Sequence, residues 1–325
     1  MYTEKTPVVL APMVGITDLP FRRCVLHFGA SGVVNEMVSS ESLTRSSRKS
    51  FQRLAFRACD KIRGRLMAQI VGNDVDRMVH AAQINQDLGV EVIDINMGCP
   101  AKKVVNTYAG SALMRDEDLA LRIVSAVVKS VSVPVSVKMR LGWDAEHLNA
   151  AVLAKKFEDA GVQCLYVHGR TRMQMFTGRA DWSKIKDVKR AVKIPVLCNG
   201  DIRTIDDAKQ ALQESECDGV MIGRAALGAP WVLNQMLVAL NDDNTQQAAE
   251  LPTRQMQKQI MLEHMNDTLQ FYGEESGMRI FRKHLGWYSK GLPGASQFRE
   301  YVNHSMDVQS VLDAIERLYD EGYAT

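Results

Sequence analysis

The chain of 325 residues lacks several features that would assign it to a familiar class of protein. Its six cysteines are scattered, without a C-x-x-C pair or a metal-ligand spacing, so the sequence favours a reducing compartment over a disulfide framework or a bound metal. No run of about 18 apolar residues occurs, and the N-terminus MYTEKTPVVLAPM has no basic stretch before a long apolar run. We therefore expect a cytoplasmic protein with no membrane span, signal peptide or metal site.

Neither the overall charge nor a dinucleotide-binding motif indicates what the protein binds. The net charge is +2 and the sequence pI is about 8.2, so any surface that binds phosphate groups must be local. No G-x-G-x-x-G follows the first expected strand, which lowers the case for a dinucleotide-binding fold. The 46% of apolar residues is ample for one large core and a smaller second one.

The chain instead shows a regular alternation of short apolar runs with amphipathic helical patterns. Eight such units in about 240 residues predict an α/β protein with a (β/α)8 (TIM) barrel, and an open doubly wound sheet is the alternative. The expected strands are Val8–Met13, Gly32–Met37, Arg65–Val71, Val92–Met97, Pro134–Met139, Cys164–His168, Pro195–Asn199 and Gly219–Gly223.

Helices are expected between these strands and again beyond them. Thr17-Asp18 and Thr204 are suited to cap helix N-termini, and Gly29, Gly89 and Gly161 to end helices. The polar stretch NDDNTQQAAELP predicts a linker, so we expect a catalytic barrel over residues 1–240, a linker over 241–252 and a small helical domain over 253–325. The helices expected in that last part are Arg254–Tyr272, Met278–Lys290, Ala295–Ser305 and Val308–Glu321.

Polar and glycine residues gather where the expected strands end, which is where barrel enzymes place their active sites. Asn199-Gly200-Asp201 and Gly223-Arg224 follow the last two strands, a region that often binds phosphate through backbone amides, with Arg224 adding charge-assisted hydrogen bonds. Two tight turns and a surface arginine would give the same pattern. Taken together, the two segments favour a phosphate site.

Two side chains inside the expected strands suit a flavin ring. Lys138 could stabilise the ring's N1/C2 carbonyl edge, unless it pairs with Glu36 or Asp94 inside the barrel. Gln69 could read the N3–H and carbonyl groups of the ring, unless its amide is satisfied by neighbouring strands. His168 could contact cofactor or substrate, or serve only the structure.

Cys99 lies between Gly98 and Pro100 on an expected loop, where a thiol can reach a substrate. Saturating the C5=C6 bond of uracil needs a hydride at C6 and a proton at C5, and a positioned thiol can give the proton. The remaining cysteines are expected to be small buried side chains. They are Cys24, Cys59, Cys164, Cys198 and Cys217.

Seven segments in order resemble the tRNA-dihydrouridine synthases, and among them the bacterial B-type branch. They are APMVGITDLPFR, MAQIVG, INMGCPAKKV, VKMRLGW, HGRTR, NGDI and MIGRAALGAPW, which cover most of residues 8–232, and RKHLGWYSKGLPGA at Arg282–Ala295 resembles the helical domain of that branch. The resemblance implies FMN as the prosthetic group, NADPH or NADH as the reductant, and tRNA as the substrate and partner.

The resemblance also implies roles for individual residues. Cys99 would be the proton donor to uracil C5, Asn96 and Arg140 would lie around the uracil, and His168 would contact the flavin phosphate or the substrate. The implied FMN contacts are Pro12, Met13, Val14, Gln69, Lys138, Asn199, Gly200, Asp201, Gly223 and Arg224.

RNA binding has one local candidate in the sequence. The stretch from Arg45 to Arg65 holds eight basic residues against one acid, Asp60, and could follow the phosphates of the tRNA or be a solvated helix face. Two other functions stay open: a flavin barrel acting on a free pyrimidine, as the dihydroorotate dehydrogenases do, and a non-catalytic RNA-binding module. We expect a monomer.

Overall fold

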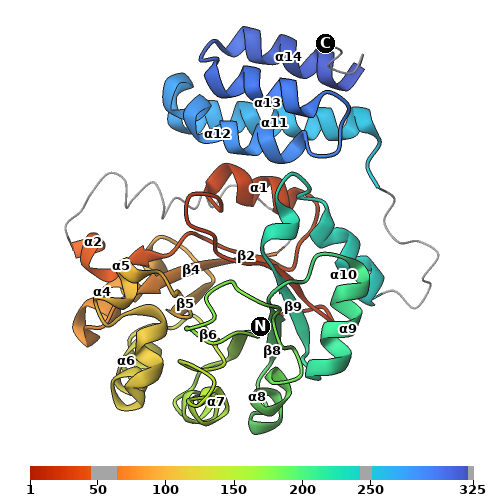
Figure 1. The fold of residues 1–325 in the computed structure, drawn as a ribbon. Helices are drawn as coiled ribbons and strands as arrows, with labels where there is room; N and C mark the ends of the chain where they lie inside the picture. Colours follow the sequence, from red (N-terminus) through yellow and green to blue (C-terminus); the bar gives the residue numbers. More distant parts are fainter. Residues whose placement is uncertain (45–63, 242–250, 321–325) are drawn as a thin grey trace.

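Eight parallel strands form a closed barrel in the computed structural model, which describes residues 1–44, 64–241 and 251–320 (Figure 1). The strand order is β2-β1-β9-β8-β7-β6-β5-β4, and β2 also pairs with β4, which closes the ring. A two-residue strand, β3 (Val38–Ser39), was not expected from the sequence and pairs with the end of β4. The predicted (β/α)8 barrel is confirmed.

Each of the eight expected runs coincides with one strand of the barrel, although β6 extends one residue beyond its expected run, to Arg140. Pro134 and Pro195 directly precede β6 and β8, where the missing amide donor is harmless, and their carbonyl groups accept hydrogen bonds from the neighbouring strands. The strands are β1 (Val8–Leu10), β2 (Gly32–Val34), β4 (Arg65–Val71), β5 (Val92–Met97), β6 (Val135–Arg140), β7 (Cys164–His168), β8 (Val196–Asn199) and β9 (Gly219–Ile222).

Helices surround the barrel, and their ends follow the expected capping residues (Figure 1). Asp18 accepts a hydrogen bond from the amide of Phe21 at the start of α1, and Thr204 forms a capping box with Asp207 at the start of α9. The helices are α1 (Leu19–His27), α2 (Ser40–Thr44), α4 (Val75–Asp87), α5 (Lys102–Val105), α6 (Glu117–Ser130), α7 (Ala150–Asp159), α8 (Ile185–Ala191), α9 (Ile205–Ser215) and α10 (Val232–Asn241), with 3-10 helices η1 (Gly110–Arg115) and η2 (Arg224–Ala226).

Two apolar layers stabilise the barrel. The larger core lies between the strands and the helices, where one face of each strand meets the apolar stripes of the helices. A second cluster fills the N-terminal half of the barrel interior and includes Met67, Tyr166 and Met221, with Tyr2 packed against it. The interior is therefore closed by side chains at the N-terminal end, and the cavity lies toward the C-terminal end.

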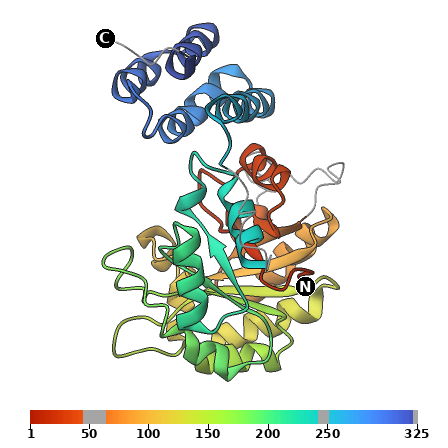
Figure 2. The same cartoon turned by 90° about the vertical axis from the view of Figure 1, so that its right-hand side faces the viewer.

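Four further helices pack into a separate unit beside α1 (Figures 1 and 2). Phe21 of α1 lies 5.4 Å from the ring of His264 and 5.5 Å from that of His284, and Arg23 pairs with Asp267 at 2.9 Å. The unit is thus attached to the barrel through α1. Its helices are α11 (Arg254–Tyr272), α12 (Glu274–Tyr288), α13 (Ala295–His304) and α14 (Val308–Asp320).

Two sequence expectations fall largely outside the described residues. Of the basic residues from Arg45 to Arg65, the structure describes only Arg65, which begins β4 at the N-terminal end of the barrel and pairs with Glu91 at 2.8 Å. Arg65 is therefore not part of a phosphate-binding surface at the barrel mouth. Of the expected linker, Asn241 is the last residue of α10. Among the helices that the structure describes, none is both long and apolar enough to cross a membrane.

The packing of Phe21 gives a test of how the two units stabilise each other. Phe21 is fully buried between the barrel core and the two histidines, so Phe21→Ala is expected to lower the free energy of unfolding by about 3–5 kcal/mol. Chemical denaturation followed by circular dichroism would measure the loss. Val152→Ala, at a side chain that is 53% exposed on α7, is the control and should change stability by less than about 0.5 kcal/mol. Equal stability of the two variants would contradict the assignment.

Candidate active site

A cavity of about 380 Å³ opens at the C-terminal ends of the barrel strands. Every site residue predicted from the sequence lies on its wall, although these residues come from seven strands and the loops that follow them. They are Pro12, Met13, Val14, Gln69, Asn96, Cys99, Lys138, Arg140, His168, Asn199, Gly200, Asp201, Gly223 and Arg224. The closed barrel is what brings them together, because parallel strands end on the same rim.

A chain of side-chain amides crosses β4 and β5 at the base of the cavity. Gln69 donates to Asp94 at 2.6 Å and accepts from Asn96 at 2.7 Å. Side chains on the neighbouring strand therefore already bind the Gln69 amide, as the structural alternative predicted. The amide still has a second N–H and a second lone pair that could bind a ligand. Burial raises the pKa of Asp94 to about 6, against the hydrogen bonds from Gln69 and Ser136.

The loop that carries Cys99 is held by hydrogen bonds on both of its peptide faces. The side-chain oxygen of Asn96 accepts from the amides of Gly98, at 3.0 Å, and Cys99, at 2.9 Å. Ser111 donates to the carbonyl of Cys99 at 2.9 Å, and Arg140 donates to that of Gly98 at 2.8 Å. The Cys99 thiol therefore projects from a fixed backbone, which is what a directed proton transfer requires.

Arg140 is almost fully buried at the side of the cavity and uses its guanidinium mainly for backbone carbonyls. Besides Gly98, it donates to Thr171 and Met175, both at 2.8 Å. Its guanidinium carbon also lies 5.6 Å from the ring centroid of Phe176 on the cavity wall. Arg140 thus fixes the β5 and β7 loops relative to each other, and it faces the ligand space only in part.

Lys138 extends from β6 into the cavity and donates to Asn199 on β8 at 3.1 Å. Within the described residues its hydrogen bond goes to Asn199, while Asp94, whose charge still acts on Lys138, accepts from Gln69 and Ser136. Burial, followed by the charge of Arg140, lowers the pKa of Lys138 to about 8. A neutral amide offsets little of the cost of burying an ammonium, so this side chain is suited to an anionic or electron-rich ligand.

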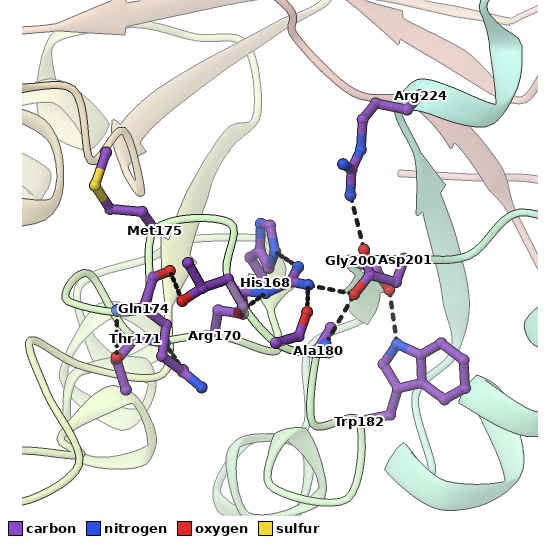
Figure 3. Close-up of polar contacts among 12 residues, drawn as sticks. His168, Arg170, Thr171, Gln174, Met175, Ala180, Trp182, Gly200, Asp201 and Arg224 are labelled. Atoms are coloured by element: carbon purple, nitrogen blue, oxygen red, sulfur yellow. Dashed lines mark hydrogen bonds and ion pairs between the residues drawn. The ribbon is translucent and has the colours of Figure 1, made fainter.

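The loops after β7 and β8 form an ionic network that Figure 3 shows. Arg170 donates to Asp201, to the carbonyls of Thr177 and Gly178, and to the ring of His168 at 3.2 Å. Because Arg170 donates to Nε2 of His168, the proton of the neutral ring is assigned to Nδ1. Burial and the surrounding cations lower the pKa of His168 well below its usual value, so the ring is uncharged.

Asp201 connects this network to the cavity rim. Its carboxylate accepts from Ala180 at 2.9 Å and from Arg224 at 2.7 Å, in addition to Arg170 (Figure 3). Burial alone would raise the pKa of Asp201, but the Ala180 amide and the two arginines hold it below the usual value. Among the described residues that line the cavity, Asp201 is the only acid, and its charge is already shared by two arginines. The described part of the rim is therefore positively charged.

Two glycines shape this rim in different ways, Gly200 by allowing close packing and Gly223 by leaving open space. Gly200 has φ +114°, and a Cβ there would lie 2.7 Å from Ala180 and 2.9 Å from the His168 ring. A Cβ at Gly223 would meet protein atoms only at 3.7 Å or more, so the glycine leaves space on the cavity wall. With the apolar side chains of Met13 and Met221 on the same wall, the arrangement suits a flat ligand that carries an anionic group.

The comparisons with known proteins agree with this site. A family model described as dihydrouridine synthase matches residues 9–321. The chain belongs to the dihydrouridine synthase family. The resemblance predicted from the motifs is therefore confirmed, and with it the prediction that the protein is an enzyme.

The relatives of this family member match over nearly their whole length. A probable tRNA-dihydrouridine synthase of Rickettsia bellii is 48% identical over 312 residues, which are 96% of this chain and 94% of the relative. The tRNA-dihydrouridine synthase B of Pseudomonas aeruginosa is 45% identical over 320 residues, 98% of this chain and 95% of the relative. That of Xanthomonas campestris is 43% identical over 320 residues, 98% and 94% of the two chains. These names agree with the predicted likeness to the B-type branch.

Sequence reasoning missed several residues that shape this dihydrouridine synthase site. Ser111 and Arg170 hold the predicted residues in place, and Phe176 lines the cavity. Arg170 belongs to the HGRTR segment, although no role was predicted for it. The other two residues give no signal in the sequence, since each acts through a loop whose path depends on tertiary contacts. Of the other cysteines, Cys59 lies outside the described residues, Cys24 is half-buried, and Cys164, Cys198 and Cys217 are buried as expected. In residues 1–44, 64–241 and 251–320, no three His, Cys, Asp or Glu side chains form a group that could hold a metal ion.

Gly200 offers a test of the close approach between the β7 and β8 loops. Gly200→Ala combines an unfavourable φ with contacts below 3.0 Å to Ala180 and the His168 ring, so we expect a loss of about 2–5 kcal/mol in the free energy of unfolding. Gly178→Ala is the matched control, because Gly178 has φ +65° and no atom near a built Cβ, and should cost about 1 kcal/mol. Thermal and urea unfolding would compare the two variants, and a smaller loss at Gly200 would overturn the assignment.

Proposed function

We propose that this protein reduces the C5=C6 bond of specific uridines in tRNA to give 5,6-dihydrouridine, with FMN as prosthetic group and NADPH or NADH as reductant. The observation that carries the proposal is the placement of the Cys99 thiol, on a fixed loop, in the same cavity as Lys138 and the glycines after β8 and β9. Relatives named tRNA-dihydrouridine synthase support the choice of reaction and the cytoplasm as its place.

The cavity residues fit FMN. The backbone at Gly200 and Gly223, with Arg224 beside them, could hold the phosphate, and Lys138 could face the N1/C2 carbonyl edge of the ring. Gln69 keeps one N–H and one lone pair for the opposite part of the ring. The contacts of Pro12, Met13, Val14, His168, Asn199 and Asp201 with FMN are part of the same proposal, with Asp201 acting chiefly by orienting Arg224.

The reaction balances with one reductant and one proton from the protein. FMN, when bound, would carry two electrons from the reduced nicotinamide to uracil C6 as a hydride. Cys99 would give the proton to C5 from its Sγ atom and regain one from solvent, so that uridine, NADPH and a proton yield dihydrouridine and NADP⁺. Asn96 and Arg140 hold the peptide of Cys99, and we propose that they also border the uracil.

The substrate must enter the cavity as a single base. A uridine stacked within folded tRNA has to be extruded, at a cost of a few kcal/mol, before its C5 and C6 atoms can reach a barrel mouth. The unit of α11–α14, attached beside the β1–α1 loop, gives a surface on which RNA could be held while this occurs. A reductase of free pyrimidines would have no need of such a unit.

The direct test uses the purified protein reconstituted with FMN. It is expected to be yellow, and with NADPH it should form dihydrouridine in unmodified tRNA transcripts, measured by mass spectrometry of nuclease fragments. Free uracil and dihydroorotate are the parallel substrates. Turnover of a free pyrimidine without RNA would favour the dihydroorotate dehydrogenase-like alternative. A colourless protein that binds tRNA and reduces nothing would indicate an RNA-binding module.

The role of Cys99 can be separated from cofactor binding. Cys99→Ala should keep its FMN, because the loop is held by backbone hydrogen bonds, but lose about 10²–10⁴-fold in turnover with tRNA as the proton donor is removed. Cys217→Ala, at a buried thiol away from the cavity, is the control and should keep full turnover. The proton-donor role is wrong if Cys99→Ala turns over at the rate of the control.

Lys138 predicts a pH dependence of cofactor binding. Its pKa of about 8 in the free protein means that the ammonium form, which favours an electron-rich ligand, is present below that pH and lost above it. FMN affinity should therefore be flat near pH 7 and fall by up to about tenfold per pH unit above pH 8. Quenching of flavin fluorescence by the apoprotein measures this. Lys138→Met should bind more weakly at pH 7 and show no such fall. A wild-type affinity that stays constant to about pH 9.5 would exclude this role for the ammonium.

A further inference from the structure

Two arginines share one indole ring in the loops after β5, β6 and β7, at the end of the barrel where the cavity opens. The guanidinium carbons of Arg115 and Arg172 each lie 4.8 Å from the ring centroid of Trp143. Arg115 ends η1 after β5, Trp143 follows β6, and Arg172 follows β7. We call these three residues the Arg–Trp–Arg cluster. Cation–π contacts of this kind orient guanidinium groups without neutralising them.

The charge of the cluster is not balanced within the described residues. Neither arginine has a carboxylate within ion-pair distance, and the Nε atom of Arg172 is buried without a hydrogen-bond partner. The adjacent acids are engaged elsewhere: Asp116 caps α6, and Asp144 accepts from the amide and ring of His147. The two guanidinium carbons are at most about 10 Å apart, close to one Debye length at physiological salt, so their repulsion persists.

Hydrogen bonds hold the backbone of the loops that carry the cluster, so both arginines project from fixed positions. The β6–β7 hydrogen-bond pattern continues past the strand ends, from Leu141 to Arg170 at 3.1 Å, from Arg172 to Gly142 at 3.0 Å and from Met173 to Trp143 at 2.9 Å. On the other side, η1 is joined to the Cys99 loop through Ser111. The cluster is therefore built onto the same three loops that carry Cys99, Arg140 and His168.

We propose that the Arg–Trp–Arg cluster binds a backbone phosphate of the RNA next to the uridine that enters the cavity. The inference rests on the proposed function. An extruded nucleotide keeps its phosphodiester links to both neighbours, so the strand must cross the rim close to the cavity. Two guanidinium groups that lack an anionic partner can give a phosphate several charge-assisted hydrogen bonds. The exposed side chains of Met173 and Phe176 beside them offer apolar surface to an adjoining base.

The test uses the FMN-loaded enzyme and an unmodified transcript of a tRNA that it reduces. Arg115→Gln/Arg172→Gln is expected to weaken transcript binding about tenfold near 150 mM salt and to reduce the slope of log Kd against log salt by about 0.7–0.9, the value for one phosphate contact. Flavin content and the KM for NADPH should match the wild type. Arg122→Gln/Lys129→Gln, on the exposed face of α6, removes the same charge and should leave Kd and slope nearly unchanged.

A conservative variant distinguishes binding from folding. Arg115→Lys/Arg172→Lys keeps both charges and should recover most of the salt slope while binding remains weaker, because an ammonium lacks the planar fork of donors. A Gln variant with the wild-type Kd and salt slope would overturn the inference. A raised KM for NADPH with unchanged transcript binding would also overturn it, and would assign the cluster to the nicotinamide cofactor. If the wild-type enzyme reduces no tRNA, the proposed function itself has failed, a result distinct from either of these.

Discussion

The peptide between Gly98 and Cys99 is the constraint on which the site depends. The amides of Gly98 and Cys99 both donate to the side-chain oxygen of Asn96, and the carbonyls of the same two residues accept from Arg140 and Ser111. Three separate elements, β5, η1 and β6, therefore converge on two residues. Each of these polar groups is buried or nearly so, and each would be costly there without its partner. The backbone of the loop is therefore held in place, and the thiol projects from a fixed position.

The cavity is positively charged because its cationic side chains have few anionic partners. Arg140 and Arg170 donate to backbone carbonyls, which leaves their formal charges without full compensation. Asp201 is shared by two arginines, and Lys138 has only the amide of Asn199. His168 stays neutral because a further positive charge among these cations would be unfavourable. The fold therefore creates a positive potential at the cavity, although the net charge of the chain is only +2.

The sequence predicted the strands and the cavity wall because both follow from short-range patterns. Apolar runs mark the strands, and a barrel places whatever follows each strand on one rim, so Lys138 and Gly223 could be located without knowing their partners. The partners themselves were not predictable. Arg140 pairs with carbonyls of the β5 and β7 loops, and the Arg–Trp–Arg cluster forms only because the β6–β7 pattern extends past the strands. Such contacts depend on loop paths that no residue spacing encodes.

The β1–α1 loop belongs both to the cavity and to the contact with the helical unit. Val14 is 52% exposed on the cavity wall, while the next residue, Gly15, turns with φ +76° and accepts a hydrogen bond from Lys283 of α12. One turn later, α1 packs Phe21 against the two histidines of that unit. A shift of α11 and α12 would therefore move the cavity wall as well. If the protein acts as proposed on a single base of a large RNA, this coupling sets the distance between the unit that would hold the RNA and the thiol that would act on the base.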